Sequence, residues 1–327
     1  METKVLDIQN GLDLAVVLLR KGELVAFPTE TVYGLGADCT NTDAVNKIFE
    51  AKGRPQDNPL IVHIADIEDV KKVAREIPEE FYILAKKFLP GPLTIILKKS
   101  DMVSPSVTCG LDTVGIRMPN NEIAREIIRK SGVFMAAPSA NSSKHISPTT
   151  AKHVFDDLNG KIPLIIDGGS SEVGIESTII DLSAEPTILR PGAITREMLE
   201  EVLGTVGEFK GKIKVAKAPG MKYKHYAPKV PAVMCDTIEE VIAKYKEAVK
   251  NDLRPVIIGK NHPEYFCLNL LNIGSNGSEY ARNVYNALHI AEENYGYIIV
   301  EKLEDEGVSH SVMNRLLKAT AEQPKNS

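Results

Sequence analysis

The segment Leu24–Leu35, with the sequence LVAFPTETVYGL, decides how the N-terminal two-thirds of the chain is interpreted. Its first four residues are apolar and of strand length, Pro28 ends the run, and Thr29 and Thr31 follow before Gly34. A buried strand that runs into polar residues and a glycine can place hydroxyl groups at the edge of a sheet. The same residues also fit a tight turn closed by its own hydroxyl groups, so the segment alone leaves both interpretations open.

Outward from this segment, apolar runs of strand length alternate with stretches of helical periodicity. The apolar runs predict strands at 24–27, 60–64, 93–97, 114–118, 133–137, 164–166, 178–180 and 188–189, and apolar spacing predicts helices at 41–51, 79–88 and 121–131. Several connections between these strands are too short for the crossover that parallel pairing needs. We therefore predict an α/β domain with a mixed, twisted sheet over residues 1–210.

A smaller domain of the same class is predicted over 230–327. Strands are expected at 232–234, 255–258 and 297–300, and helices at 237–250, 278–294 and 309–319. This regular alternation is typical of a Rossmann-like, doubly wound domain. The segment 211–229 between the domains holds six lysines and no acidic residue. It suits a contact with one compact anion, or a solvated linker.

Length and composition argue against a disordered, membrane-spanning or secreted protein. A chain of 327 residues suffices for about two domains, and 43% hydrophobic with 25% charged residues argues against disorder. No apolar stretch approaches the ~20 residues of a membrane span, and the N-terminus lacks the layout of a signal peptide. The four cysteines lie far apart without a C-x-x-C motif, which excludes a zinc ribbon and suits a reducing cytosol. We expect a cytoplasmic protein without a membrane partner.

The sequence lacks the common motifs for phosphate loops and serine nucleophiles. Neither G-x-x-x-x-G-K-[ST] nor G-x-G-x-x-G occurs, and in the nearest match, which starts at Gly34, Cys39 stands where a third glycine is needed. The G-x-S-x-G elbow is also absent from the sequence. Any phosphate site must therefore be built from side chains and scattered backbone amides.

Charged residues near the predicted strand and helix ends are candidate ligand contacts. Lys52 and Arg54 flank Gly53, where a helix is predicted to end. They fit favourable contacts with the helix carbonyls and also the grip of an anion. Arg117 lies within a predicted strand and is costly to bury unpaired, so it needs a structural acid or a ligand carboxylate. His63, in another strand, fits a hydrogen-bonded core histidine.

Small and hydroxyl-bearing residues gather beside the later strand ends. Ser139 and Asn141 provide neutral donors and acceptors among small neighbours. Ser147–Thr149 is predicted to open a helix, either as an anion site or simply as an N-cap followed by proline. A further strand delivers Arg190. Together these residues suit a polyanionic ligand that is held in position without covalent chemistry.

The order and spacing of these motifs closely resemble the YrdC-like family of L-threonylcarbamoyl-adenylate synthases. The matching pieces are Thr29–Leu35, Lys52–Arg54, Pro138–Asn141, Ser147–Thr149, Glu176–Thr178 and the linker Pro219–Pro228. The chain is similar to the long form, in which a YrdC-like domain is followed by a basic linker and a Rossmann-like C-terminal extension. The resemblance covers essentially the whole chain.

The resemblance implies a nucleotidyltransferase reaction. L-threonine, bicarbonate or CO2, and ATP would condense to threonylcarbamoyl-AMP and pyrophosphate, with Mg2+ accompanying the ATP. A downstream machinery would then pass the threonylcarbamoyl group to an adenosine of certain tRNAs. Whether this chain itself binds tRNA is left open by the resemblance.

The resemblance also implies roles for individual residues. Threonine would be held by Thr31, His63, Arg117, Ser177 and the backbone of Ala137. ATP would contact Arg54, Asn58, Thr113, Ser139, Ser147, Arg190, His225 and Tyr226. The catalytic set around the reacting phosphates would be Lys52, Arg54, Ser139 and Asn141, and no protein ligand of the metal is specified. We expect residues 218–228 to act as a lid over this cleft.

Two other functions fit parts of the pattern. An RNA-binding module of the same fold would use a cationic concave surface, but it should carry aromatic stacking platforms, and this chain has no Trp. A carbamoyltransferase of the maturation type would use the same fold on carbamoyl phosphate. Such proteins usually carry zinc-finger or acylphosphatase modules, and no C-x-x-C spacing occurs here.

Overall fold

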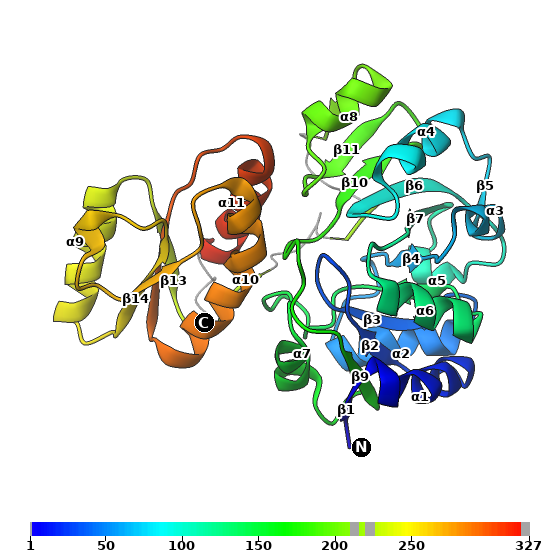
Figure 1. Ribbon diagram of the computed structural model, residues 1–327, viewed down its shortest axis with the longest axis horizontal. Coiled ribbons are helices and arrows are strands. Elements are labelled where there is room, and N and C mark those ends of the chain that lie inside the picture. Colours follow the sequence, from blue (N-terminus) through cyan, green and yellow to red (C-terminus); the bar gives the residue numbers. More distant parts are fainter. Residues whose placement is uncertain (1, 210–215, 220–225, 322–327) are drawn as a thin grey trace. The chain divides into compact units, whose positions relative to one another are not determined.

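The computed structural model describes residues 2–209, 216–219 and 226–321 and divides into two compact units. The N-terminal unit comprises Met1–Ser143 with Ser147–Tyr223, and the C-terminal unit comprises Lys144–Ile146 with Lys224–Ser327. Each unit is an α/β structure with its own sheet (Figure 1). Within the described residues, no helix combines the length and apolar character needed to cross a bilayer.

A mixed sheet of 12 strands organises the described part of the N-terminal unit. Its order is β1-β9-β2-β3-β8-β4-β7-β6-β10-β11-β12, with β5 paired to β6. The strands are β1 (Lys4–Asp7), β2 (Val25–Phe27), β3 (Gly34–Asp38), β4 (Ile61–His63), β5 (Ala74–Arg75), β6 (Leu93–Lys99), β7 (Thr113–Arg117), β8 (Met135–Ala137), β9 (Leu164–Asp167), β10 (Thr178–Asp181), β11 (Thr187–Arg190) and β12 (Gly207–Glu208). Parallel pairs such as β4–β7 and antiparallel pairs such as β2–β3 both occur, which confirms the predicted mixed sheet.

Helices cover both faces of this sheet (Figure 1). They are α1 (Ile8–Arg20), α2 (Thr42–Lys52), α3 (Val70–Val73), α4 (Glu79–Phe88), α5 (Pro105–Thr108), α6 (Glu122–Ser131), α7 (Ala151–Leu158) and α8 (Arg196–Leu203), with a 3-10 turn at Ile67–Asp69. Alternate residues of β2 enter different core clusters: Val25 and Phe27 belong to the cluster that contains residues of α1 and α6, whereas Ala26 belongs to the cluster that contains residues of α2 and α4. This two-residue alternation is what a strand buried on both faces requires.

Most predicted elements of the N-terminal unit form within a few residues of their expected bounds, but there are also differences. Helices α1 and α8, strands β1 and β3 and several short elements were not predicted. The helix expected to open at Ser147–Thr149 begins instead at Ala151, so that prediction is wrong. Thr150 is the N-cap, with its side chain accepting a hydrogen bond from the backbone of His153. Residues 147–149 stay outside the helix, where the carbonyl of Pro148 accepts from the backbone N–H of Tyr33.

The C-terminal unit has a smaller sheet of four parallel strands in the order β13-β16-β14-β15. The strands are β13 (Ala232–Cys235), β14 (Pro255–Gly259), β15 (Leu270–Asn272) and β16 (Tyr297–Glu301), and the helices are α9 (Ile238–Lys250), α10 (Gly277–Asn294) and α11 (Gly307–Thr320), with a 3-10 turn at Pro263–Tyr265. Parallel strands joined by helices are the doubly wound arrangement. The prediction of a Rossmann-like α/β domain is confirmed, although strand β15 was not expected.

Candidate active site

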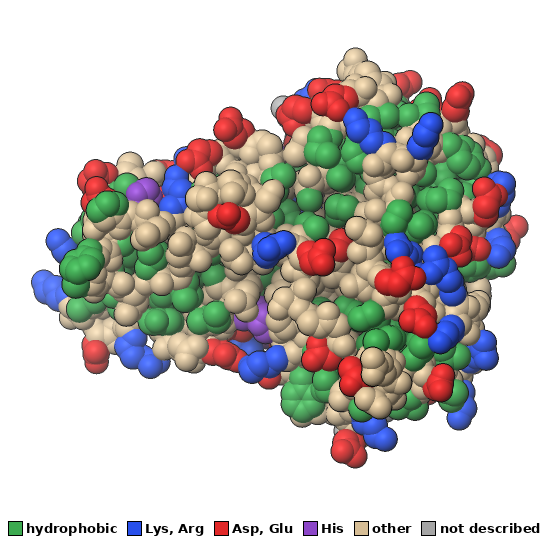
Figure 2. All heavy atoms as spheres, in the orientation of Figure 1, with side chains coloured by type: hydrophobic (Ala, Val, Ile, Leu, Met, Phe, Trp, Pro, Cys, Tyr) green, Lys and Arg blue, Asp and Glu red, His purple; other side chains and the backbone are tan. Residues whose placement is uncertain are grey.

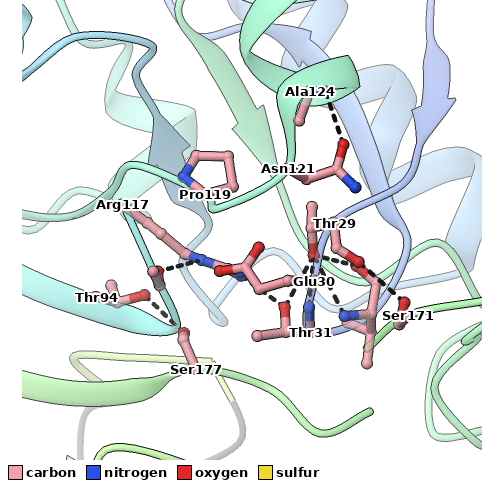
Figure 3. A network of polar contacts seen from close by, with 12 residues as sticks. Thr29, Glu30, Thr31, Thr94, Arg117, Pro119, Asn121, Ala124, Ser171 and Ser177 are labelled. Atoms are coloured by element: carbon pink, nitrogen blue, oxygen red, sulfur yellow. Dashed lines mark hydrogen bonds and ion pairs between the residues drawn. The ribbon is translucent and has the colours of Figure 1, made fainter. Parts of the chain in front are cut away.

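The turn that follows β2 is closed by the side chain of Thr29. Its hydroxyl donates to the carbonyl of Val32 at 2.6 Å and accepts from the backbone N–H groups of Thr31 and Val32 at 3.2 and 3.3 Å. Ser171 donates to the Thr29 carbonyl at 3.0 Å and fixes the turn from outside. The tight-turn interpretation therefore holds. The turn also directs the Thr31 hydroxyl toward the last residue of β7, Arg117 (Figure 3).

Arg117 is a buried cation whose guanidinium lies among oxygen atoms. Its Nη1 donates to Thr31 Oγ1 at 2.7 Å, and its Nε lies 3.4 Å from the carbonyl oxygen of Gly91. Its Nη2 lies 2.8 Å from Oε2 of Glu30, and only 5% and 4% of the two side chains are exposed. Of the two partners left open by the sequence, the structure supplies a structural acid. Glu30 was not predicted as a site residue, although it stands beside Thr31 in the decisive segment.

His63 lies next to Arg117 across the sheet, because β4 and β7 pair in parallel with these two residues in register. Its ring packs edge-on against Phe27, with the ring centroids 5.8 Å apart. Burial, and then the positive charge of Arg117, lower the pKa of His63 to about 3. The ring is therefore neutral near pH 7. Its Nδ1 lies 3.2 Å from the carbonyl oxygen of Ile61, and the backbone of Met135 also interacts with the ring. The tautomer that donates from Nδ1 has Nε2 as its acceptor.

Ser177 is fixed by contacts from two neighbouring strands. Its hydroxyl lies 2.7 Å from Thr94 Oγ1 on β6, and Arg190 on β11 donates to it from Nη2 at 3.1 Å. The same arginine donates from Nε to the Ser177 carbonyl at 3.0 Å and from Nη1 to the Pro219 carbonyl at 3.4 Å. All three polar side chains are buried. Thr94 was not predicted as a site residue. The sequence feature that could have indicated it is a hydroxyl group within an otherwise apolar strand.

Lys52 connects the end of α2 to the loop after β8. The helix ends at Gly53, whose φ of 58° suits a residue without a Cβ. The Lys52 ammonium donates to the Ser139 carbonyl at 2.6 Å and to the Asn141 carbonyl, and it lies 3.4 Å from Asn141 Oδ1. Burial, and then the charge of Arg54, hold the pKa of Lys52 well below its usual range. Lys52 therefore organises the 139–141 loop instead of capping its own helix.

The remaining polar residues of this region are also held in place. Ser139 donates from Oγ to Asn141 Oδ1 at 2.5 Å. Arg54 donates from Nε to the Asn58 carbonyl at 3.2 Å, and Asn58 is itself almost fully buried. Oδ1 of Asn58 accepts no hydrogen bond from any described residue. Ser147 donates to the buried Glu176 carboxylate at 2.6 Å.

The structure brings most of the expected residues to one sheet. Thr31, His63, Arg117 and Ser177 lie in or beside β4, β7 and β10, and Lys52, Ser139 and Asn141 are joined by hydrogen bonds. Thr113 begins β7 and Ala137 ends β8, where it pairs with Ile61. Tyr226 belongs to the C-terminal unit, with its ring centroid 5.4 Å from that of Tyr285. His225 lies outside the described residues.

Comparisons with known proteins agree on one family. Residues 17–192 match the Sua5/YciO/YrdC family, described as "Telomere recombination", and residues 194–321 match "Threonylcarbamoyl-AMP synthase, C-terminal domain". The threonylcarbamoyl-AMP synthase of Pyrococcus abyssi is 47% identical over 94% of this chain and 93% of its own length. The synthase of Bacillus subtilis is 46% identical over 93% and 91%.

Solved structures give the same result. The crystal structure of P. abyssi Sua5 complexed with L-threonine superposes with a TM-score of 0.91 at 43% identity, covering 98% of each chain. E. coli YciO shares the fold, with a TM-score of 0.51 at 24% identity over 58% of this chain and 93% of its own. The resemblance seen in the sequence motifs is thereby confirmed, and the chain belongs to the Sua5/YrdC family of threonylcarbamoyl-AMP synthases in its long, two-domain form.

Proposed function

We propose that this protein condenses L-threonine, CO2 or bicarbonate, and ATP into threonylcarbamoyl-AMP and pyrophosphate, as the first step in the threonylcarbamoyl modification of tRNA. The observation that carries the proposal is a buried set of polar side chains, Thr31, His63 and Arg117, in the same sheet as the 139–141 loop that Lys52 holds. The P. abyssi relative named for this activity matches nearly the whole chain.

Threonine would be held by Thr31, His63, Arg117, Ser177 and the backbone of Ala137. Arg117 would receive the carboxylate, since guanidinium groups match carboxylates in geometry and charge. Neutral His63 would accept a hydrogen bond from the threonine hydroxyl at Nε2. A buried acceptor of this kind separates threonine from valine far better than shape does, because valine would leave it unpaired. The P. abyssi relative has been crystallised in complex with L-threonine, which supports threonine as the substrate.

ATP would be contacted by Arg54, Asn58, Thr113, Ser139, Ser147, Arg190, His225 and Tyr226. Asn58 supports the assignment, because a buried carbonyl oxygen without a donor is costly unless a ligand supplies one. A donor on the nucleotide would meet that need.

The chemistry requires no nucleophile from the protein. Threonine would bind as a zwitterion and lose one ammonium proton to solvent. The free amine then attacks CO2 and loses a second proton to form a carbamate, and a carbamate oxygen attacks the α-phosphorus as the bond from phosphorus to the pyrophosphate oxygen breaks. Lys52, Arg54, Ser139 and Asn141 would align the phosphates and balance their developing charge, which is the main protein contribution to such transfers. Lys52 suits this role because its side-chain nitrogen is already fixed by the 139–141 loop, and a phosphate beside it would favour its charged form against the effects of burial and Arg54.

Mg2+ is the cation that the family reaction implies. Among the described residues, no three His, Cys, Asp or Glu side chains form a metal cage. Asn141 Oδ1 is already engaged by Ser139 and Lys52, so the ion would be held mainly by the phosphate oxygens of ATP and by water. Bound there, the ion would neutralise phosphate charge.

We further propose that residues 1–210 and 230–327 act as catalytic and accessory domains. The expected lid, residues 218–228, lies largely outside the described residues. The product would pass to a separate tRNA-modifying machinery. The described cysteines are all free thiols, which suits a reducing cytoplasm. RNA binding is not favoured as the main function, since acidic and basic side chains are interspersed on the face shown in Figure 2.

Pyrophosphate release measured with each substrate omitted in turn tests the proposal. We expect release to require threonine, bicarbonate and ATP together. Arg117→Gln should raise the KM for threonine strongly, whereas Arg129→Gln, at an exposed position on α6, should leave it unchanged. Release that continues without threonine would refute the assignment.

A further inference from the structure

Glu30 is a buried carboxylate that the proposed reaction does not use. The residue is 4% exposed, and neither of its carboxylate oxygens accepts a hydrogen bond from any described residue. Its neighbour is Nη2 of Arg117, 2.8 Å from Oε2, and Nη2 also makes no aligned hydrogen bond within the described residues. The contact is thus a close charge pair without hydrogen-bond geometry. Each partner cancels the charge of the other.

The turn after β2 aims two consecutive residues at the same guanidinium. Thr31 accepts from Nη1 while Glu30 lies against Nη2, as Figure 3 shows. In an extended strand, consecutive side chains would point to opposite sides. The Thr29 hydroxyl prevents that arrangement by closing the turn on Val32. The local backbone is therefore shaped to place a negative charge beside Arg117.

A gain in folding stability does not by itself explain why Glu30 is buried beside Arg117. A buried ion pair often contributes little net stability, because the cost of removing both charges from water offsets their attraction. A lone Arg117 would still attract the carboxylate of a substrate, but it would attract any carboxylate of suitable size. The negative partner changes that preference.

We propose that Glu30 determines specificity: it cancels the charge of Arg117, so that the pocket takes a zwitterionic amino acid and rejects a simple carboxylate anion. The inference rests on the proposed function, in which Arg117 receives the carboxylate of threonine. Glu30, Arg117 and a zwitterion together carry no net charge. The same pair with a plain carboxylate carries a buried negative charge, which is unfavourable.

Glu30 acts here through its charge and through Arg117, not by touching the substrate. Both of its oxygens are closed to solvent, so the residue is a positioning residue. Its field still reaches a ligand bound to Arg117, because charges a few ångströms apart in a partly buried site are weakly screened.

The test compares two ligands on the full-length protein by titration calorimetry. One is L-threonine and the other is 3-hydroxybutanoate, which keeps the carboxylate and the hydroxyl but lacks the amine. We expect the wild-type protein to prefer threonine. In Glu30→Gln that preference should fall about tenfold or more, because the pocket gains a net positive charge. Glu126→Gln, at a partly exposed position on α6, is the matched control and should leave the preference unchanged.

A merely structural role predicts a different result. If Glu30→Gln weakens both ligands by the same factor, the ratio of the two Kd values stays constant and the proposal is wrong. If Glu30→Gln shows no cooperative melting curve, the test uses the two Kd values of the wild-type protein. A Kd for 3-hydroxybutanoate as low as that for threonine would then overturn the proposal. A wild-type protein that binds no threonine would instead refute the proposed function itself.

Discussion

The neutral state of His63 gives a quantitative prediction about acid stability. The pKa is about 3 in the folded protein, against 6.5 for the free side chain, because burial and Arg117 oppose its protonation. A folded pKa below the unfolded one means that acid favours the unfolded state. The contribution to stability is complete above pH 6.5 and is lost as the pH falls from there toward 3.

The loss of folding stability at acid pH can be calculated from the difference between the folded and unfolded pKa values of His63. Each pKa unit corresponds to about 1.4 kcal/mol, and at pH 5 the unfolded histidine is already protonated while the folded one is not. Lowering the pH from 7.5 to 5 should therefore cost the N-terminal unit about 2 kcal/mol through His63 alone. In His63→Gln that part of the pH dependence should vanish, whatever the stability of the variant at pH 7.5.

Hydrogen-exchange mass spectrometry across a urea titration measures this effect in one unit at a time. Peptides from β4 and β7 report the free energy of unfolding of the N-terminal unit at pH 7.5 and at pH 5. His310→Gln, at a partly exposed position on α11 of the C-terminal unit, is the control and should keep the wild-type pH dependence. Equal pH dependence in the wild-type protein and His63→Gln would show that the folded histidine is protonated, and the reasoning would be refuted.

Further predictions concern three other positions. Lys52→Met should lower kcat for pyrophosphate release by ~100-fold or more, as steady-state kinetics would measure. It should also lower the free energy of unfolding by about 1–3 kcal/mol in urea, because two backbone carbonyls lose their donor. Gly192→Ala should destabilise the N-terminal unit by about 3 kcal/mol in the same unfolding assay, since its Cβ would lie 2.3 Å from the backbone nitrogen of Thr178. Asn276→Ala removes the N-cap of α10 and should cost about 1 kcal/mol in the C-terminal unit alone, as exchange of α10 peptides would report.

The fold was predictable where apolar residues were continuous or strictly periodic. The strands that carry His63 and Arg117 are short apolar runs buried on both faces, and such runs need no tertiary information to be found. Helix α1 was missed because Gly11 and the β-branched pair Val16 and Val17 weaken the helical pattern. Close packing favours Gly11, since a Cβ there would lie 2.5 Å from Ile166 Cδ1 and the isoleucine side chain would have to shift.

The site was predictable in part, for a different reason. A buried arginine needs a negatively charged partner, but the sequence did not show whether that partner was an acidic residue of the protein or a ligand. The choice of Glu30 depends on how the turn after β2 is folded. The contact between Thr94 and Ser177 joins residues 83 positions apart, and only the pairing of β6 with β10 reveals it.

The central claim is that the protein aligns a carbamate with ATP and forms no bond to either. Mass spectrometry of the products made from 18O-labelled CO2 tests it most directly. We expect both labelled oxygens in threonylcarbamoyl-AMP, one of them bridging carbon and phosphorus, and we expect the released pyrophosphate to be unlabelled. Label in inorganic phosphate together with ADP, or a carbamoyl or adenylyl adduct on the polypeptide, would contradict it.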